Sequence, residues 1–445
     1  MVLPLVAALV LTATSTAGAD DGRDFISDAK LFYRVVACGG TEAPPPELDA
    51  TVIEKHCAEM KKRYEYLQTN YIDKARAFFA PLQPVDLPKT VVYPFGGGDL
   101  LSALVTFPNA TEVTTISLEH AGDPTRLAKL TKKKQLAQSL TDFRAAVEGL
   151  MALHDSTSEN MRKLEQGGIP GQLSFHMIGM TALGFEPVSL KYFTLNDDGS
   201  IHYLSQADID AVAAKKAKKK RPSWVDTDFS EAFTHMELTF RKAGDPKAPL
   251  VVHRHFAWNL GDNGFKGSSL EKHLQAKGKI AAMTKAASYL LWTSSFRAIR
   301  DYLLANMTWM ASDSTGIEPR AAKKAGFVQT TYGTYKGAFL PEAQPTVNDQ
   351  MLEMWEKQPK RRLPFRYGYP DSEKHVHLMI TVPAPPKPVK PTVAPTPPAG
   401  TKPVAPTPPA PTKPASPPAK PATPSTGSAP AGSTPQATPP PETKK

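Results

Sequence analysis

The sequence predicts an α/β fold: a mixed sheet with a Rossmann-like β-α-β start, flanking helices and later hairpins, followed by a disordered C-terminal tail. Residues 91–119 read as a strand, a glycine-rich turn, a short helix and a second strand. After residue 187 the pattern changes to short strands paired around turns, and it predicts two hairpins: 188–195 with 201–204, and 235–240 with 250–258. Of the 44 prolines, 23 follow residue 382, a composition that cannot bury enough apolar surface to fold.

The start of the chain has the pattern of a secretory signal peptide. Residues 3–16 are almost all apolar or small, and Ala17-Gly18-Ala19 follows as a cleavage site. We therefore expect residues 1–19 to be removed and the protein to be exported to the periplasm, the cell envelope or the medium. After cleavage no stretch reaches the roughly 18 apolar residues of a transmembrane helix, so no membrane span is expected.

The mature chain divides into three parts. Residues 20–90 are predicted to be a helical region packed on the main domain, residues 91–382 the Rossmann-like α/β domain, and residues 383–445 the tail. Within the main domain we predict helices over 269–276, 279–291 and 294–305. The two cysteines, Cys38 and Cys57, are predicted to form a disulfide in an exported protein, and the alternative is two buried thiols.

The distribution of net charge along the chain indicates which kinds of partner the protein can bind. The tail carries seven lysines and one glutamate, a net charge of +6, so only about +4 of the chain's +10 belongs to the rest. This argues against nucleic acid as a partner of the folded part. The tail itself is either a passive spacer or a segment that contacts an anionic cell-envelope polymer.

The glycine turn is the predicted ligand-binding segment. Gly96, Gly97 and Gly98 let backbone amides approach a ligand closely, and Asp99 follows them. Glu119 ends the next strand, where folds of this kind bind ribose hydroxyls. These five residues predict a site for a small polar ligand, with the cofactor unknown. The alternatives are a structural turn and, for Asp99, a helix N-cap.

Three carboxylates follow predicted strands. Asp99, Glu119 and Asp313 would meet at one edge of the sheet, where carboxylates serve acid–base chemistry or bind a cation. Asp99 and Asp313 are the candidate catalytic residues. The alternative for Asp313 is a turn after a strand.

Two histidine pairs have the spacing of strand neighbours. His253 and His255, and likewise His375 and His377, each share one face of a predicted strand. Together they could supply four imidazoles to zinc or copper. The alternative is histidines of the core or the strand surface, and the sequence assigns no metal.

Two resemblances accompany these residues. Val91–Glu119 resembles the first motif of S-adenosylmethionine-dependent methyltransferases, although Tyr93-Pro94-Phe95 stands where those enzymes place an acidic residue. Tyr93-Pro94-Phe95-Gly96 with Asp99 and a Phe107-Pro108-Asn109-Ala110 break also resembles a group of uncharacterised secreted bacterial proteins. Stretches like Asp313–Ile317 and Tyr332–Tyr335 recur in that group, so the resemblance covers roughly residues 90–340. The first resemblance implies a Rossmann-like fold and a methyl donor, and the second implies a fold without an assigned activity.

These observations predict an exported protein that binds a small polar ligand in an α/β crevice. Two alternatives stay open: an envelope-associated interaction protein that uses its basic, proline-rich tail, and a methyltransferase-like transferase or a hydrolase that uses the carboxylates. Whether the protein is an enzyme is left open.

Overall fold

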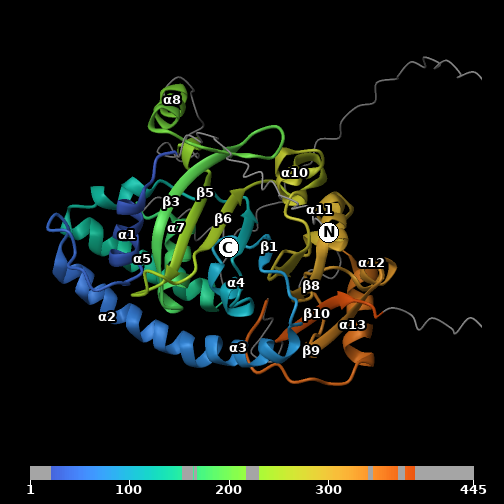
Figure 1. Ribbon diagram of the computed structural model, residues 1–445. Helices are drawn as coiled ribbons and strands as arrows, with labels where there is room; N and C mark the ends of the chain where they lie inside the picture. Colours follow the sequence, from blue (N-terminus) through green and yellow to red (C-terminus); the bar gives the residue numbers. More distant parts are fainter. Residues whose placement is uncertain are drawn as a thin grey trace, which may run out of the picture. The chain divides into compact units, whose positions relative to one another are not determined.

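The computed structural model describes residues 22–152, 164, 168–216, 230–338, 344–368 and 376–385. These residues belong to one compact unit. The predicted signal peptide, His375 and the tail after residue 385 lie outside the described residues. The described residues form a mixed α/β fold with helices packed around a central sheet (Figure 1). The sheet has ten strands, and this architecture confirms the predicted fold class.

The sheet has the strand order β4-β3-β5-β6-β2-β1-β7-β8-β10-β9. The strands are β1 (Thr90–Pro94), β2 (Glu112–Ser117), β3 (Phe185–Leu195), β4 (Ile201–Tyr203), β5 (His235–Lys242), β6 (Val251–Ala257), β7 (Ile280–Thr284), β8 (Met307–Ser312), β9 (Phe327–Gly333) and β10 (His377–Pro383).

The centre of the sheet is parallel and doubly wound. β1 pairs in parallel with β2 through the short helix α4 (Leu100–Thr106), so the predicted β-α-β start is confirmed. β6 extends the sheet beyond β2, whereas β7 and β8 extend it on the other side of β1. The direction of winding therefore reverses between β1 and β7, which is the position of the ligand crevice in open α/β sheets.

The outer strands are antiparallel. β3 pairs with β4 and β5 pairs with β6, as the later hairpins predict. β10 lies antiparallel between β8 and β9. The prediction of a helix over 279–291 is wrong, because its first part is β7. A five-residue apolar run, here IAAMT, has the same hydrophobic pattern in a buried strand as in a buried helix.

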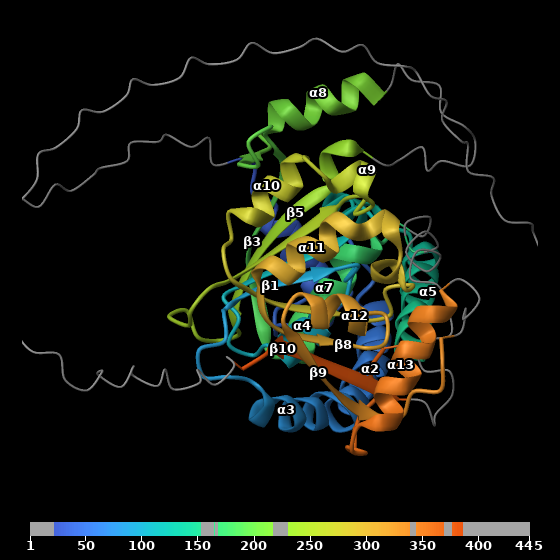
Figure 2. The same cartoon turned by 90° about the vertical axis from the view of Figure 1, so that its right-hand side faces the viewer.

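Helices cover both faces of the sheet (Figures 1 and 2). Val91 and Tyr93 of β1 face one core, which contains residues of α1, α2, α3, α4, α5 and α7. Val92 faces the opposite core, with residues of α9, α10, α11 and α12, while α13 covers a third cluster near β9 and β10. Their bounds are α1 (Ile26–Val35), α2 (Ala50–Leu67), α3 (Asp73–Phe79), α5 (Lys133–Ala152), α7 (Gly171–Ala182), α8 (Gln206–Lys216), α9 (Asp262–Phe265), α10 (Ser269–Gln275), α11 (Arg297–Asn306), α12 (Pro319–Lys324) and α13 (Pro345–Lys357).

The N-terminal helices are tied to each other and to the sheet. The predicted disulfide is present: the Sγ atoms of Cys38 and Cys57 are 2.07 Å apart and join the end of α1 to α2. Asp49 caps α2 by accepting a hydrogen bond from the Val52 amide at 3.0 Å. A π-helical turn, η1 (Gln68–Ile72), connects α2 to α3. Among the described residues, no helix has the length and apolar character needed to cross a membrane.

Candidate functional site

The site lies at the carboxyl edge of the sheet, where the loops after β1 and β7 face each other across the switch point. Their backbone is unusual. Phe95 after β1 and Ala286, Ser288 and Tyr289 after β7 have φ between 48° and 62°, and they are four of the five non-glycine residues with positive φ in the described chain. Each such residue costs about 1–3 kcal/mol, and such strain concentrates at functional sites and ligand clamps.

An ion pair connects the two loops. The Lys285 Nζ atom lies 3.0 Å from Asp99 Oδ2 and 2.9 Å from Ser102 Oγ. The Tyr93 hydroxyl donates to the same carboxylate oxygen at 3.0 Å. The side chains of Lys285 and Asp99 are 18% and 28% exposed, so solvent reaches this pair. Asp99 also accepts a hydrogen bond from the Ser102 amide at 3.1 Å. The same carboxylate therefore caps the N-terminus of α4 and pairs with Lys285.

Tyr71 completes this cluster from the π-helical turn. Its hydroxyl donates to Ser102 Oγ at 2.8 Å, and its ring centroid lies 5.6 Å from the Lys285 ammonium. Single π-helical turns often mark functional sites, because the extra residue redirects a side chain. We call Tyr71, Tyr93, Asp99, Ser102 and Lys285 the switch-point cluster.

The switch-point cluster keeps Lys285 charged. Burial disfavours the ammonium, but the Asp99 carboxylate outweighs burial and raises the pKa of Lys285. Burial, reinforced by Asp99, raises the pKa of Tyr93 well above its usual value. Lys285 is therefore a cation and not a base at neutral pH, and the Ser102 hydroxyl beside it is fully buried. This arrangement suits binding better than nucleophilic attack.

The glycine turn is held close to the sheet. The Gly96 amide donates to the Ile116 carbonyl of β2 at 3.1 Å. A Cβ atom at Gly96 would lie 2.5 Å from the Tyr93 ring, so only glycine fits there. Gly97 has φ of 45°, whereas Gly98 does not have positive φ. Gly96 and Gly97 thus have a structural role in placing Asp99, whether or not their amides also contact a ligand.

Asp313 organises the neighbouring loops from a buried position. Its Oδ2 accepts from the Ala286 amide at 2.9 Å, and its Oδ1 accepts from the Thr315 amide at 2.9 Å and from the Thr315 hydroxyl. Gly368 packs directly over the carboxylate. The side chain is 0% exposed, so Asp313 holds the left-handed loop after β7 and does not present an exposed carboxylate beside Asp99.

Glu119 lies half-buried after β2. Its carbonyl oxygen is 2.8 Å from His255 Nε2, so it joins the edge of the sheet to β6. The predicted histidine pairs are far apart: His253 and His255 lie on β6, and His377 lies on β10 with four strands between. Within the described part of the chain, no three His, Cys, Asp or Glu side chains are arranged to hold a metal ion.

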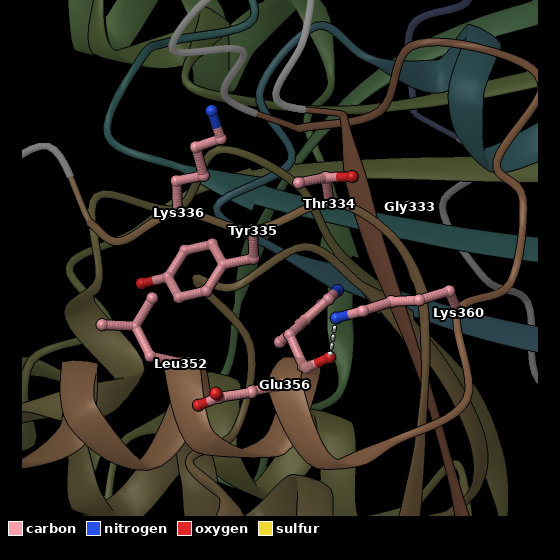
Figure 3. Close-up of a pocket in the computed structure, with 8 residues that line it drawn as sticks. Gly333, Thr334, Tyr335, Lys336, Leu352, Glu356 and Lys360 are labelled. Carbon is pink, nitrogen blue, oxygen red and sulfur yellow. Dashed lines mark hydrogen bonds between the residues drawn. The ribbon is translucent and has the colours of Figure 1, made fainter.

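A separate hollow of about 420 Å³ lies between the end of β9 and α13 (Figure 3). Tyr335 and Leu352 line it together with Lys336 and Glu356, and the Lys360 ammonium folds back to the Trp355 carbonyl at 2.8 Å. It does not include the switch-point cluster.

Sequence reasoning missed Lys285, Ser102 and Tyr71. The one local signal is that Lys285 directly follows the apolar run 280–284. The predicted helix over 279–291 covers both, so the sequence does not place Lys285 at the end of a strand.

The fold and the site define a doubly wound, mixed α/β protein with a charged cluster at its topological switch point. The chain matches no protein-family model, no curated protein and no solved structure. The geometry of the site is therefore the evidence for its function.

Proposed function

We propose that the protein binds a small polar ligand at the carboxyl edge of the sheet, over the switch point between β1 and β7. One observation carries this proposal: the loops flanking the switch point combine four left-handed non-glycine residues with a solvent-reachable Lys285–Asp99 pair. Strained backbone persists only where the surroundings enforce it, and a ligand clamp is a common reason. Crevices at switch points are also where open α/β sheets bind ligands.

The charge of the switch-point cluster indicates the kind of ligand. Lys285 has three N–H donors, and two of them bond to Asp99 and Ser102, which leaves one for a ligand oxygen. Asp99 neutralises the ammonium, so the site accommodates a neutral polar or weakly anionic group. A role as an enzyme remains only an alternative, because Ser102 and Asp313, the other groups that could take part in a reaction, are buried.

The first prediction concerns ligand binding by the full chain. In thermal unfolding with nucleotides, S-adenosylmethionine, sugars and small carboxylates, we expect at least one class to raise the midpoint. A ligand at 100 times its Kd stabilises by about 2.7 kcal/mol. Lys285→Met should abolish the shift, whereas Lys285→Arg should retain part of it.

Lys279→Met is the matched control, because Lys279 lies next to the other end of β7 and donates to the Ala305 carbonyl. Its ligand shift should equal that of the wild type. No shift with any class, or equal shifts in Lys285→Met and wild type, would contradict the proposal.

The second prediction separates stability from binding. Ala286→Gly should raise the free energy of unfolding by about 1 kcal/mol, because glycine adopts φ of 53° without steric cost. The substitution should also lower the affinity for the ligand, since the loop is no longer held in one conformation. Urea unfolding and the ligand shift measure both effects.

Ala211→Gly, on the exposed side of α8, is the control for the same chemical change. There it should destabilise by about 1 kcal/mol, because glycine is unfavourable inside a helix. If Ala286→Gly destabilises the protein too, the left-handed loop is not strained.

A further inference from the structure

A second cluster lies under α7 and shares no residue with the switch-point cluster. His176 of α7 packs on His253 and His255 of β6, and all three side chains are 0% exposed. The ring centroid of His176 is 4.3 Å from that of His253 and 5.7 Å from that of His255. We call these three residues the histidine cluster.

The hydrogen bonds assign the tautomers of two of these rings. The Nε2 atom of His255 faces the Glu119 carbonyl, which only accepts, so Nε2 carries the proton. In the neutral ring the other nitrogen, Nδ1, is bare and accepts from the Thr115 hydroxyl at 3.1 Å. The Thr115 hydroxyl has one proton, which it donates to His255. It must therefore accept a hydrogen bond from His253 Nε2 at 3.0 Å. His253 is then protonated at Nε2 and bare at Nδ1.

This chain of hydrogen bonds ends on unpartnered nitrogens. His253 Nδ1 and both ring nitrogens of His176 have no hydrogen-bond partner among the described residues. One turn before His176, the buried Gln172 leaves its Oε1 unpartnered as well. A proton that enters the cluster therefore creates a buried imidazolium without the acceptors that would stabilise it.

The charges around the cluster give it little compensation. The titratable neighbours are Glu119 and His120 after β2, His235 at the start of β5, and Arg254 on β6. Among these four, Glu119 alone favours a positive charge. Burial is the main cause that lowers the pKa of His176 and His253 well below the usual value, and it lowers the pKa of His255 to about 4.

We propose that the histidine cluster is an acid-triggered switch that releases α7 from β6 and β2. The sign follows from linkage: unfolded histidine titrates near pH 6.5, and the folded cluster takes up protons only at lower pH. The stability from the neutral rings is complete above about pH 6.5. It is lost as the pH falls below that value towards the lowered pKa values of the folded cluster, of which that of His255 is about 4. α7 opens first because it supplies His176 and contributes no charged side chain to the contact.

Release of α7 would also affect α4, because α7 packs on it. A Cβ atom at Gly179 of α7 would lie 2.9 Å from the Leu101 amide, so the two helices touch at their backbones. Release of α7 therefore uncovers α4, which carries Asp99 at its start. The switch itself does not depend on the proposed ligand.

Hydrogen exchange of the full chain between pH 7.5 and 4.5 tests this switch. After correction for intrinsic exchange rates, peptides from α7 should lose protection at higher pH than peptides from α11 on the opposite face. In His176→Phe the opening of α7 should shift to lower pH. The slope of the log protection factor of α7 against pH, which reports the number of protons taken up on opening, should fall by about one. Phenylalanine fills the ring volume, and His176 has no hydrogen bond to lose.

His176→Asn, which also cannot titrate in this range, should show the same loss of slope if the phenylalanine variant does not fold. His202→Gln is the control, since His202 on β4 is 44% exposed and should leave the α7 opening unchanged. Loss of α7 and α11 protection in one transition would overturn the proposal. An unchanged slope in both His176 variants would overturn it too.

Discussion

Trp309→Ala is expected to lower the free energy of unfolding by about 4 kcal/mol, the usual range for removing a buried tryptophan being 3–5 kcal/mol. Trp309 lies on β8 and is 0% exposed. Its ring packs edge-on against Phe107 at 5.4 Å and Phe79 at 6.2 Å between centroids, and its Nε1 donates to the Leu82 carbonyl at 3.1 Å. The side chain therefore joins the N-terminal helices to the centre of the sheet.

Urea unfolding with two further variants isolates the cause. Trp309→Phe keeps an aromatic ring but loses volume and the hydrogen bond, so it should cost about 1–2 kcal/mol. Tyr66→Ala, at a side chain that is 64% exposed on α2, should change the stability by less than about 0.5 kcal/mol. A small loss in Trp309→Ala, similar to that of Tyr66→Ala, would show that the helices do not depend on this contact.

Arg254→Met is expected to cost about 3 kcal/mol. On the sheet face opposite α7, the Arg254 guanidinium bonds Glu112 at 2.5 Å and Glu237 at 2.7 Å, and the Lys277 ammonium also bonds Glu112. These side chains are largely buried, and removing one partner of a buried ion pair costs about 3–5 kcal/mol. Their residual exposure places the expected loss at the lower end.

A neighbouring pair provides the control. Arg241 on β5 lies 3.4 Å from Glu186, but both side chains are more exposed, so Arg241→Met should cost less than about 1 kcal/mol. Arg254→Lys should be intermediate, because lysine keeps the charge but cannot bond both carboxylates with a planar fork. Equal losses in Arg254→Met and Arg241→Met by urea unfolding would mean that burial adds nothing to this network.

Much of the fold follows from local signals in the sequence. The alternation of apolar residues and the turn residues between them predict both hairpins, β3–β4 and β5–β6. The glycine turn between two apolar runs predicts the parallel β1-α4-β2 start. The sequence does not predict β7, because a run of five apolar residues has the same hydrophobic pattern in a strand and in a helix. The segment is a strand because it pairs with β1 and β8.

The site was only partly predictable for the same reason. Asp99 could be found because it follows a strand and a glycine turn, which are local features. Its partner Lys285 is 186 residues away in sequence, and no pattern near either residue indicates that they meet. Asp313 also follows a strand as predicted, but packing against Gly368 buries it, and burial by a distant segment leaves no trace in the local pattern.

The amino-acid order therefore determines the two hairpins, the β1-α4-β2 start, the glycine loop and the cysteine pair, because each depends mainly on residues near it in the chain. The order of strands across the sheet, the Lys285–Asp99 pair and the unpartnered histidines under α7 arise only when distant segments pack. The free energy of each of these contacts depends on how far packing shields the groups from water. That shielding comes from the assembled sheet and helices and not from any single stretch of sequence.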